Sequence, residues 1–243
     1  VRELPRARGE TRVKPDRLKA VLFDLDGTLV DTAAEFVVVV QRLRAEHDLP
    51  PMDPQRISAS VSNGARALVR LGLDLPYEAP EFEDKRQRLL ALYSEVLGTA
   101  ATPYPGIPSL LSELRARGIA WGVATNKPRA YAEPLLQALG LMGTGAPGAA
   151  HAPCQSLVCP DDVKDRKPHP ESLYLNCREI GCAPHEAIYV GDHLRDVDAG
   201  KRAGMYTVAA AYGYIEPGDD PAAWGADALA HCSTELAALL LDH

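Results

Sequence analysis

Residues 19–32, with the sequence KAVLFDLDGTLVDT, constrain the fold more than any other part of the chain. Ala20 to Phe23 form a short apolar run, which is typical of a strand buried on both faces of a parallel sheet. Asp24 and Asp26 follow at alternate positions, so their carboxylates lie on one side of the strand's end. The next residue is a glycine, which permits a sharp turn, and Thr32-Ala-Ala-Glu35 predicts a capping box. The stretch therefore predicts a strand, a turn and the start of a helix.

Two acids at a strand end are typical of a catalytic site. Open α/β sheets bind their ligands at this end of the strands, and one of two paired carboxylates can act as nucleophile or metal ligand while the other donates a proton. A hairpin turn at Asp26-Gly27 is a weaker interpretation, since helix-start residues follow it. An EF-hand calcium loop would need a glycine where Leu29 stands and a helix in place of the apolar strand. Solvation of the acids at the surface conflicts with the apolar flank. We therefore favour a functional site at this strand end.

The charge and the apolar content of the chain indicate which kinds of molecule it binds. The formal net charge of −7 disfavours a nucleic-acid partner, which normally leaves a basic footprint, and favours a small molecule. No stretch approaches the ~18 uninterrupted apolar residues of a membrane helix, so we expect a soluble protein with no membrane partner. Residues 1–17 are rich in charge and lack the apolar segment of a secretory signal, which predicts a flexible tail.

The five cysteines indicate a reducing compartment. They form two C-x4-C pairs and one single residue, at positions 154, 159, 177, 182 and 232. This spacing differs from the C-x2-C pattern of zinc sites, and no paired histidine pattern accompanies it. We therefore expect reduced, mostly buried thiols and a cytoplasmic location.

The rest of the chain divides into a helical insert and an alternating α/β segment. The insert is predicted to contain helices over residues 32–48, 57–71 with an interruption near Asn63-Gly64, and 81–97. After the breaker Tyr104-Pro-Gly-Ile-Pro108, strands and helices alternate. The strands are predicted at 119–124, 156–159, 187–190, 206–210 and around 228, and the helices at 109–117, 130–139, 170–180, 195–203 and from 233. Such alternation predicts a doubly wound parallel sheet.

We accordingly expect three parts. They are a tail of residues 1–17, an α/β core of residues 18–32 and 104–243, and an all-helical domain of residues 33–103 inserted into the core. A literal match to G-x-G-x-x-G at residues 143–148 follows a helix and contains a proline, so it lacks the preceding strand and the helix start of a dinucleotide site. We expect a mobile loop over residues 142–155 instead.

Polar side chains follow four of the predicted strands and could meet at one edge of the sheet. In chain order they are Asp24 and Asp26, Thr125 and Asn126, Lys167, and finally Asp192 and Asp196. Each group alone has an ordinary explanation, such as a helix cap, a solvated lysine or a turn. Acids that converge at low dielectric repel one another, so a divalent cation and a lysine are the natural compensation, and Mg²⁺ prefers oxygen ligands. The joint order therefore favours one active site.

These motifs resemble those of the haloacid dehalogenase superfamily of aspartate-dependent phosphatases. Asp24-Leu-Asp26-Gly-Thr28 is similar to the first motif of that family, Thr125 to the second, Lys167 to the third, and Gly191-Asp192 through Asp196 to the fourth. The resemblance covers residues 18–243 in the expected order. It implies a Rossmann-like core and, because the helical insert lies between the first two motifs, a mobile helical cap.

The resemblance also implies a role for each motif residue. Asp24 would be the nucleophile that forms an aspartyl-phosphate, and Asp26 would donate and later accept the proton. The Mg²⁺ cofactor would be bound by Asp24, the backbone carbonyl of Asp26 and Asp192, with Asp196 orienting these ligands from behind. Thr125 and Lys167 would bind the phosphoryl oxygens as catalytic residues, and the substrate would be bound by Thr28, Asn126 and a cap arginine, Arg66 or Arg70.

Two positions leave alternatives open. His193 stands where the fourth motif more often has a small or acidic residue, and it would either face solvent or touch the water shell of the metal. Lys164 lies near Lys167, but only Lys167 is followed by the proline that the third motif usually shows. We therefore assign the third motif to Lys167.

Within the family, the chain looks most similar to phosphoglycolate phosphatases, which act on 2-phosphoglycolate, and alternatively to phosphatases of N-acetylmuramic acid 6-phosphate. Tyr212-Gly-Tyr-Ile215 and Asn63-Gly-Ala-Arg66 are further parts of this likeness. One rival is a phosphomutase of the same superfamily, which returns phosphate to a sugar. Another is a receiver-type phospho-aspartate switch, for which the chain is too long. We expect a monomer or homodimer that acts on a small phosphorylated metabolite.

Overall fold

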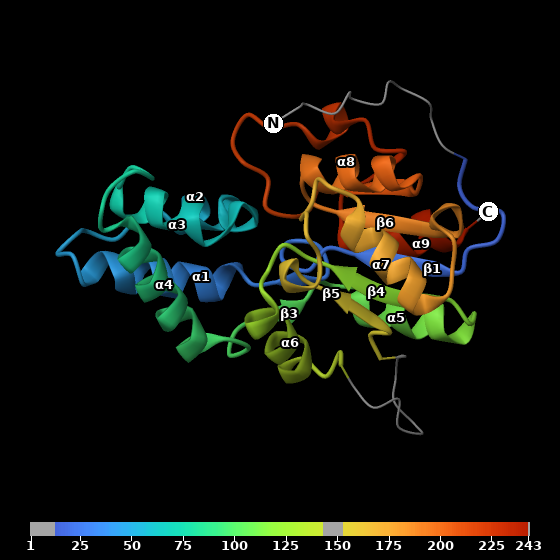
Figure 1. Cartoon of the computed structure of the whole chain (residues 1–243), viewed down its shortest axis with the longest axis horizontal. Helices are drawn as coiled ribbons and strands as arrows, with labels where there is room; N and C mark the ends of the chain where they lie inside the picture. The colour runs from blue at the N-terminus through green and yellow to red at the C-terminus, as the bar shows by residue number, and fades with distance from the viewer. Residues whose placement is uncertain (1–12, 143–152, 243) are drawn as a thin grey trace.

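The computed structural model describes residues 13–142 and 153–242. Six parallel strands form one sheet in the order β5, β4, β1, β6, β7, β8 (Figure 1). Their bounds are β1 Ala20–Phe23, β4 Ala120–Ala124, β5 Ser156–Val158, β6 Ala187–Gly191, β7 Tyr206–Ala210 and β8 Ala228–Ala230. Because β1 pairs with β4 on one side and β6 on the other, the strand that leads to the paired aspartates lies inside the sheet.

Helices cover both faces of this sheet. Their bounds are α5 Ile107–Ala116, α6 Arg129–Ala138, α7 Glu171–Ile180, α8 Leu194–Ala203 and α9 Leu236–Leu241. Val21 and Phe23 of β1 share an apolar core with α5, α6 and α9. Ala20 and Leu22, which point to the opposite face, pack with α7 and α8. The expected doubly wound, Rossmann-like core is therefore confirmed, and burial on both faces explains the unbroken apolar run of β1.

Four further helices form the inserted cap. Their bounds are α1 Ala33–Ala45, α2 Pro54–Ala59, α3 Gly64–Leu73 and α4 Phe82–Val96. They enclose an apolar core of their own that includes Phe36, Leu68 and Leu89, and in Figure 1 they gather beside the sheet, at the left of the view. The predicted interruption is a 3-10 turn, Val61–Asn63, followed by Gly64 with a φ of 79°. The inserted all-helical cap is thus confirmed.

A short antiparallel ribbon links the cap to the core. β2 (Val30–Asp31) pairs with β3 (Thr102–Pro103), where the chain enters and leaves the insert. Immediately beyond it, the backbone amide of Tyr104 donates to the carbonyl of Leu29 at 3.2 Å. Strands of two residues are too short to show a period of two, so the sequence did not indicate them. The ribbon lies beside the predicted boundaries at residues 32 and 104.

The capping box predicted at Thr32 and Glu35 is wrong. Helix α1 does begin directly after Thr32, but the Thr32 hydroxyl donates to Asp26 Oδ1 at 2.7 Å. The buried Glu35 carboxylate accepts from the backbone amides of Ala100 and Ala101 at 3.1 and 3.0 Å. Buried polar groups must find partners, and here partners far away in the sequence take precedence over the local motif.

Parts of the expected tail and loop lie outside the described residues. These parts are residues 1–12 of the tail and residues 143–152, which contain the G-x-G-x-x-G match. In the described part of the tail, Lys14 Nζ donates to the backbone carbonyl of Asp242, and Pro15 is buried. Within the two described ranges, no helix is long and apolar enough to cross a membrane.

Candidate active site

Lys167 lies at the centre of the polar groups that follow the strands. Its ammonium is 2.9 Å from Asp24 Oδ1 and 2.8 Å from Asp196 Oδ1, and only 1% of its side chain is exposed. It also donates to the carbonyl of Ala124 at 2.7 Å and to the Tyr189 hydroxyl at 2.8 Å. Burial lowers the pKa of Lys167, but the charges of Asp196 and Asp24 outweigh it and the net shift is upward. The lysine therefore stays charged.

Three buried carboxylates converge beside this lysine. One oxygen from each of Asp24, Asp192 and Asp196 lies within 4.8 Å of the others. Burial is the largest effect that raises the pKa of Asp24, and Asp196 adds to it against the pull of Lys167. Burial, then the charges of Asp24 and Asp196, raise the pKa of Asp192. The ionised forms of Asp24 and Asp192 are thus disfavoured unless a positive charge lies nearby.

The same carboxylates fit a divalent cation. Lys167 supplies one positive charge against three buried acids, so charge remains to be compensated. Asp196 Oδ2 is buried and has no hydrogen-bond partner in the described part of the chain. A cluster of hard oxygen donors is the ligand chemistry that Mg²⁺ prefers. The donor set is therefore compatible with the expected cofactor.

Asp192 also receives bonds from the cap and from the segment after β7. The hydroxyl of Ser62, in the 3-10 turn of the cap, donates to Asp192 Oδ2 at 2.8 Å, and the Tyr214 amide donates to the same oxygen at 2.9 Å. The Thr28 hydroxyl lies 3.4 Å from Asp192 Oδ1. Thr28 is thus brought to the acidic cluster. Ser62 was not predicted, because a lone serine in a polar turn carries no motif.

The backbone approaches Asp192 so closely at Gly27 and Gly213 that neither position has room for a side chain. A Cβ at Gly27, whose φ is 82°, would lie 2.0 Å from Asp192 Oδ2. A Cβ at Gly213 would lie 2.2 Å from Asp192 Cβ and 2.5 Å from the carbonyl oxygen of Gly27. Gly213 belongs to the Tyr212–Ile215 stretch, so that stretch packs directly on two of the predicted motifs. Any larger residue would push them apart.

Asp26 lies in a separate environment from the three carboxylates. Its Oδ1 accepts from the Thr32 hydroxyl and from the ammonium of Lys127, which is 2.9 Å away. The Lys127 ammonium also lies 5.1 Å from the ring centroid of Phe36 and 4.5 Å from that of Tyr93. Lys127 was not predicted as a site residue, although its place directly after Thr125-Asn126 at a strand end could have indicated it.

Thr125 and Asn126 are brought to the same region. Thr125 is 4% exposed, and its hydroxyl accepts from the Lys127 amide at 3.0 Å. Asn126 Nδ2 donates to the carbonyl of Lys167 at 3.2 Å, and its Oδ1 is buried without a partner among the described residues. Asn126 therefore joins the loop after β4 to the loop that carries Lys167, whereas the Thr125 hydroxyl bonds within its own loop.

The cap arginines lie in a different place. The Arg66 guanidinium is 5.2 Å from the ring centroid of Tyr77 and 5.1 Å from that of Phe82, and Arg70 lies 5.4 Å from Tyr77. These are contacts within the cap, and both arginines are exposed. No hydrogen bond or ion pair within the described ranges joins Arg66 to the core motifs. Its binding of substrate stays a prediction.

His193 caps helix α8. Its Nδ1 accepts from the backbone amide of Arg195 at 3.2 Å, and its ring lies near that of Trp224, with centroids 6.3 Å apart. Burial is the largest effect that lowers the pKa of His193, so the neutral ring that can accept this bond is favoured. The half-buried ring therefore has a structural role that neither expected alternative included.

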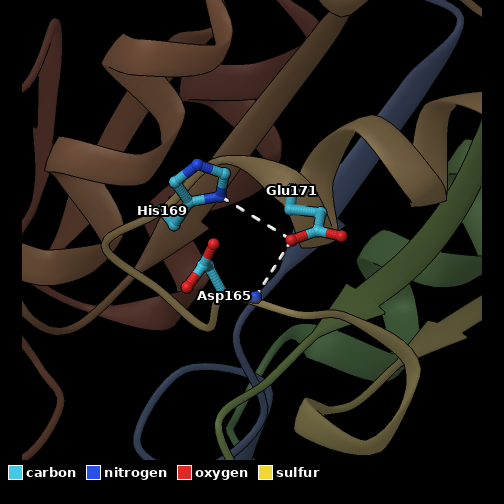
Figure 2. Close-up of side chains that lie close together, drawn as sticks. All are labelled: Asp165, His169 and Glu171. Carbon is cyan, nitrogen blue, oxygen red and sulfur yellow. Dashed lines mark hydrogen bonds and ion pairs between the residues drawn. The ribbon is translucent and has the colours of Figure 1, made fainter.

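A second group of potential metal ligands is Asp165, His169 and Glu171 (Figure 2). Glu171 accepts from the Asp165 amide at 3.0 Å and lies 3.9 Å from His169 Nδ1. All three side chains are at least partly exposed. The Asp165–Glu171 hydrogen bond closes the loop that carries Lys167 and leads into α7, and that role accounts for the group without a ligand.

Comparisons with known proteins show which family this chain is similar to. A family model described as haloacid dehalogenase-like hydrolase matches residues 21–210. The chain is similar to N-acetylmuramic acid 6-phosphate phosphatase of Pseudomonas aeruginosa, with 46% identity over 92% of this chain and 95% of the relative. It is also similar to a phosphoglycolate phosphatase of Xanthomonas campestris pv. campestris, with 36% identity over 87% of this chain and 91% of the relative. Among solved structures, a predicted phosphoglycolate phosphatase from Haemophilus somnus matches with a TM-score of 0.76 and 26% identity, over 91% of this chain and 97% of that one.

Proposed function

The chain belongs to the haloacid dehalogenase-like hydrolase family, and from this premise we propose that it is a Mg²⁺-dependent phosphatase of a small phosphomonoester. The observation that supports this chemistry is that the two paired acids, Asp24 and Asp26, contact different side chains. Asp24 contacts the buried Lys167 beside two further carboxylates, whereas Asp26 contacts Thr32 and Lys127. Two carboxylates in different environments suit two roles, nucleophile and proton carrier.

In the first half-reaction, a carboxylate oxygen of Asp24 attacks phosphorus and forms an aspartyl-phosphate. The bond between phosphorus and the ester oxygen breaks. The carboxylic acid of Asp26 gives its proton to that oxygen, which leaves as an alcohol, and Asp26 becomes a carboxylate.

In the second half-reaction, a water molecule attacks phosphorus of the aspartyl-phosphate. The Asp26 carboxylate takes one proton from this water, while the remaining hydroxyl group bonds to phosphorus. The bond between phosphorus and the Asp24 oxygen breaks, which releases inorganic phosphate. Asp24 is again a carboxylate and Asp26 a carboxylic acid, so the cycle closes.

The remaining motif residues bind and orient. Lys167, Thr125 and Asn126 would bind phosphoryl oxygens, and Asp196 holds the Lys167 ammonium in place. Mg²⁺, held by Asp24, the backbone carbonyl of Asp26 and Asp192, would neutralise charge on the phosphoryl group. The cap closes the site to water and restricts it to small substrates.

We propose N-acetylmuramic acid 6-phosphate as the preferred substrate. The N-acetylmuramic acid 6-phosphate phosphatase reported above is 46% identical to this chain, whereas the phosphoglycolate phosphatase is 36% identical. This difference supports N-acetylmuramic acid 6-phosphate over the initial expectation of 2-phosphoglycolate. Phosphoglycolate remains the second candidate, because other similar proteins carry that name. Both compounds bear a carboxylate, which Arg66 could pair with if substrate binding draws it away from Tyr77 and Phe82.

A substrate panel tests this proposal. We expect kcat/KM for N-acetylmuramic acid 6-phosphate to exceed that for glucose 6-phosphate at least tenfold, about 1.4 kcal/mol of transition-state free energy. A higher value for 2-phosphoglycolate would support the second candidate, and glucose 6-phosphate as the best substrate would contradict both. Arg66→Ala should reduce this preference, Arg70→Ala tests the other cap arginine that was expected to bind substrate, and Arg56→Ala, an exposed arginine of α2, serves as the control.

The Asp24→Asn variant tests the chemistry independently of the substrate. The amide keeps the shape of the side chain but is not a nucleophile, so phosphate release should stop while circular dichroism stays unchanged. Substantial turnover by this variant would contradict the assignment. Phosphate release by the wild type without a sugar acceptor distinguishes hydrolysis from phosphomutase action, and multiple turnover distinguishes it from a receiver-type switch.

We also infer a cytoplasmic location from the cysteines. The five cysteines, at 154, 159, 177, 182 and 232, are all free thiols. Burial raises the pKa of Cys154 and of Cys159 to about 12 in each case, so these thiols stay protonated. Free thiols are typical of proteins in reducing compartments.

A further inference from the structure

Lys127 joins the core to the cap through an almost completely buried ammonium. It stands in the loop after β4, and only 6% of its side chain is exposed. On the core side it forms an ion pair of 2.9 Å with Asp26 Oδ1. A lysine is seldom buried unless its charge is compensated, so the groups that surround the Lys127 ammonium must compensate it.

On the cap side, the compensation comes from two aromatic rings. The rings of Phe36 in α1 and Tyr93 in α4 are stacked, with centroids 4.3 Å apart and an interplanar angle of 12°. The Lys127 ammonium lies 5.1 Å from the first centroid and 4.5 Å from the second. Both distances are within the ~6 Å over which a cation is attracted to a ring face. A movement of the cap by a few ångströms would end this attraction.

The Asp26 carboxylate is held through one of its two oxygens. Both the Lys127 ammonium and the Thr32 hydroxyl bond to Oδ1, at 2.9 and 2.7 Å. Two donors on one oxygen fix the rotation of the carboxylate and present Oδ2 as the atom that can exchange a proton. Thr32 lies next to the β2–β3 ribbon and precedes α1, so this donor too lies at the junction of cap and core.

We propose that Lys127 is a positioning residue that acts through Asp26. Its ammonium holds the carboxylate in the orientation for proton transfer while the rings of Phe36 and Tyr93 cover it. When the cap opens, water replaces the rings, the ammonium loses its position and Asp26 loses one of its two restraints. Proton transfer is thereby coupled to cap closure. This inference rests on the proposed function, in which Asp26 is the acid and base.

Lys127→Met is the first test, because methionine keeps the apolar packing against the rings and removes the charge. The readout is kcat/KM for two substrates with different leaving groups. An alkyl phosphate such as glycerol 2-phosphate needs a proton on its leaving oxygen, whereas p-nitrophenyl phosphate releases a phenolate that does not. We expect the loss on the alkyl phosphate to exceed the loss on p-nitrophenyl phosphate at least about tenfold, because a general acid contributes about 10²–10⁴-fold and Lys127→Met should forfeit part of that contribution.

Three further variants make the result specific, and a fourth replaces Lys127→Met if that variant does not fold. Lys127→Arg retains a cation for the rings and the carboxylate, so it should restore most of the wild-type leaving-group profile. Phe36→Leu removes one ring and should shift the profile in the same direction as Lys127→Met, but less. Lys164→Met changes an exposed lysine and should leave the profile unaltered. Lys127→Gln replaces Lys127→Met if circular dichroism shows that the methionine variant is unfolded.

Equal losses on both substrates, or no loss on either, would overturn the inference. Asp26→Asn separates this failure from failure of the proposed function. If Asp26→Asn shows the leaving-group dependence and folded Lys127→Met does not, Lys127 does not position Asp26 and the proposed chemistry stands. If Asp26→Asn itself lacks the dependence, Asp26 is not the proton donor and both proposals fail.

Discussion

Replacing Lys167 by methionine should destabilise the protein strongly in the absence of metal. The ammonium lies 2.9 Å from Asp24 and 2.8 Å from Asp196, with 1% of the side chain exposed. Methionine has similar length and fills similar space, so the substitution removes the charge with little change in packing. Two buried carboxylates then lose their cation and remain beside a third, Asp192.

The magnitude follows from these contacts. Removing one partner of a buried ion pair costs about 3–5 kcal/mol, because the remaining charge is left uncompensated. The Ala124 carbonyl loses its bond from Lys167, but the Tyr189 hydroxyl, which is 3.0 Å away, can still donate to it. We therefore add nothing for that acceptor. For a chain of this length, the loss corresponds to a fall in Tm of about 6–20 °C.

Thermal unfolding followed by circular dichroism in chelator measures this loss. Lys164→Met is the matched control, because this lysine is exposed on the same loop and should change stability by less than about 0.5 kcal/mol. Adding Asp196→Asn to Lys167→Met removes one of the repelling charges, so the double variant should be more stable than the single one. Added Mg²⁺ should also narrow the gap to the wild type. A loss below about 1 kcal/mol would refute the reasoning, because the lysine would then not compensate buried charge.

Three other predictions follow from the site. Chelator should abolish phosphate release and Ca²⁺ should inhibit it, because its larger, looser coordination misplaces the nucleophile; unchanged rates in chelator would contradict the metal assignment. Gly213→Ala should lower the free energy of unfolding by about 1–3 kcal/mol, since its Cβ would lie 2.2 Å from Asp192 Cβ, and wild-type thermal stability would argue against this close approach. Tyr214→Phe should lower the free energy of unfolding in urea by about 2–3 kcal/mol, because the Tyr214 hydroxyl accepts from two backbone amides and donates to Asp31. Tyr212→Phe is the control, because it loses one hydrogen bond and should cost about 1 kcal/mol. Equal losses for the two variants would count against the hydroxyl network.

The sequence by itself determined where the strands end and which polar groups stand there. The apolar run before Asp24 and the alternation after residue 104 are local patterns, and burial on both faces of a parallel sheet requires them. The proline after Lys167, which the third motif of the family usually shows, distinguished it from Lys164, and the structure brings Lys167 to Asp24. Such features depend on a few neighbouring residues, so they can be read without knowing what packs against them.

Only the tertiary structure decided how those groups are partnered. Asp26 and Lys127 are 101 positions apart, and Ser62 and Asp192 are 130 positions apart, so no period or spacing links them. The capping box failed for the same reason, since Glu35 bonds amides 65 and 66 positions away. A buried polar group takes whichever partner the fold brings within reach, and that partner is fixed by packing within the cap and between cap and core rather than by the residues beside it in the chain.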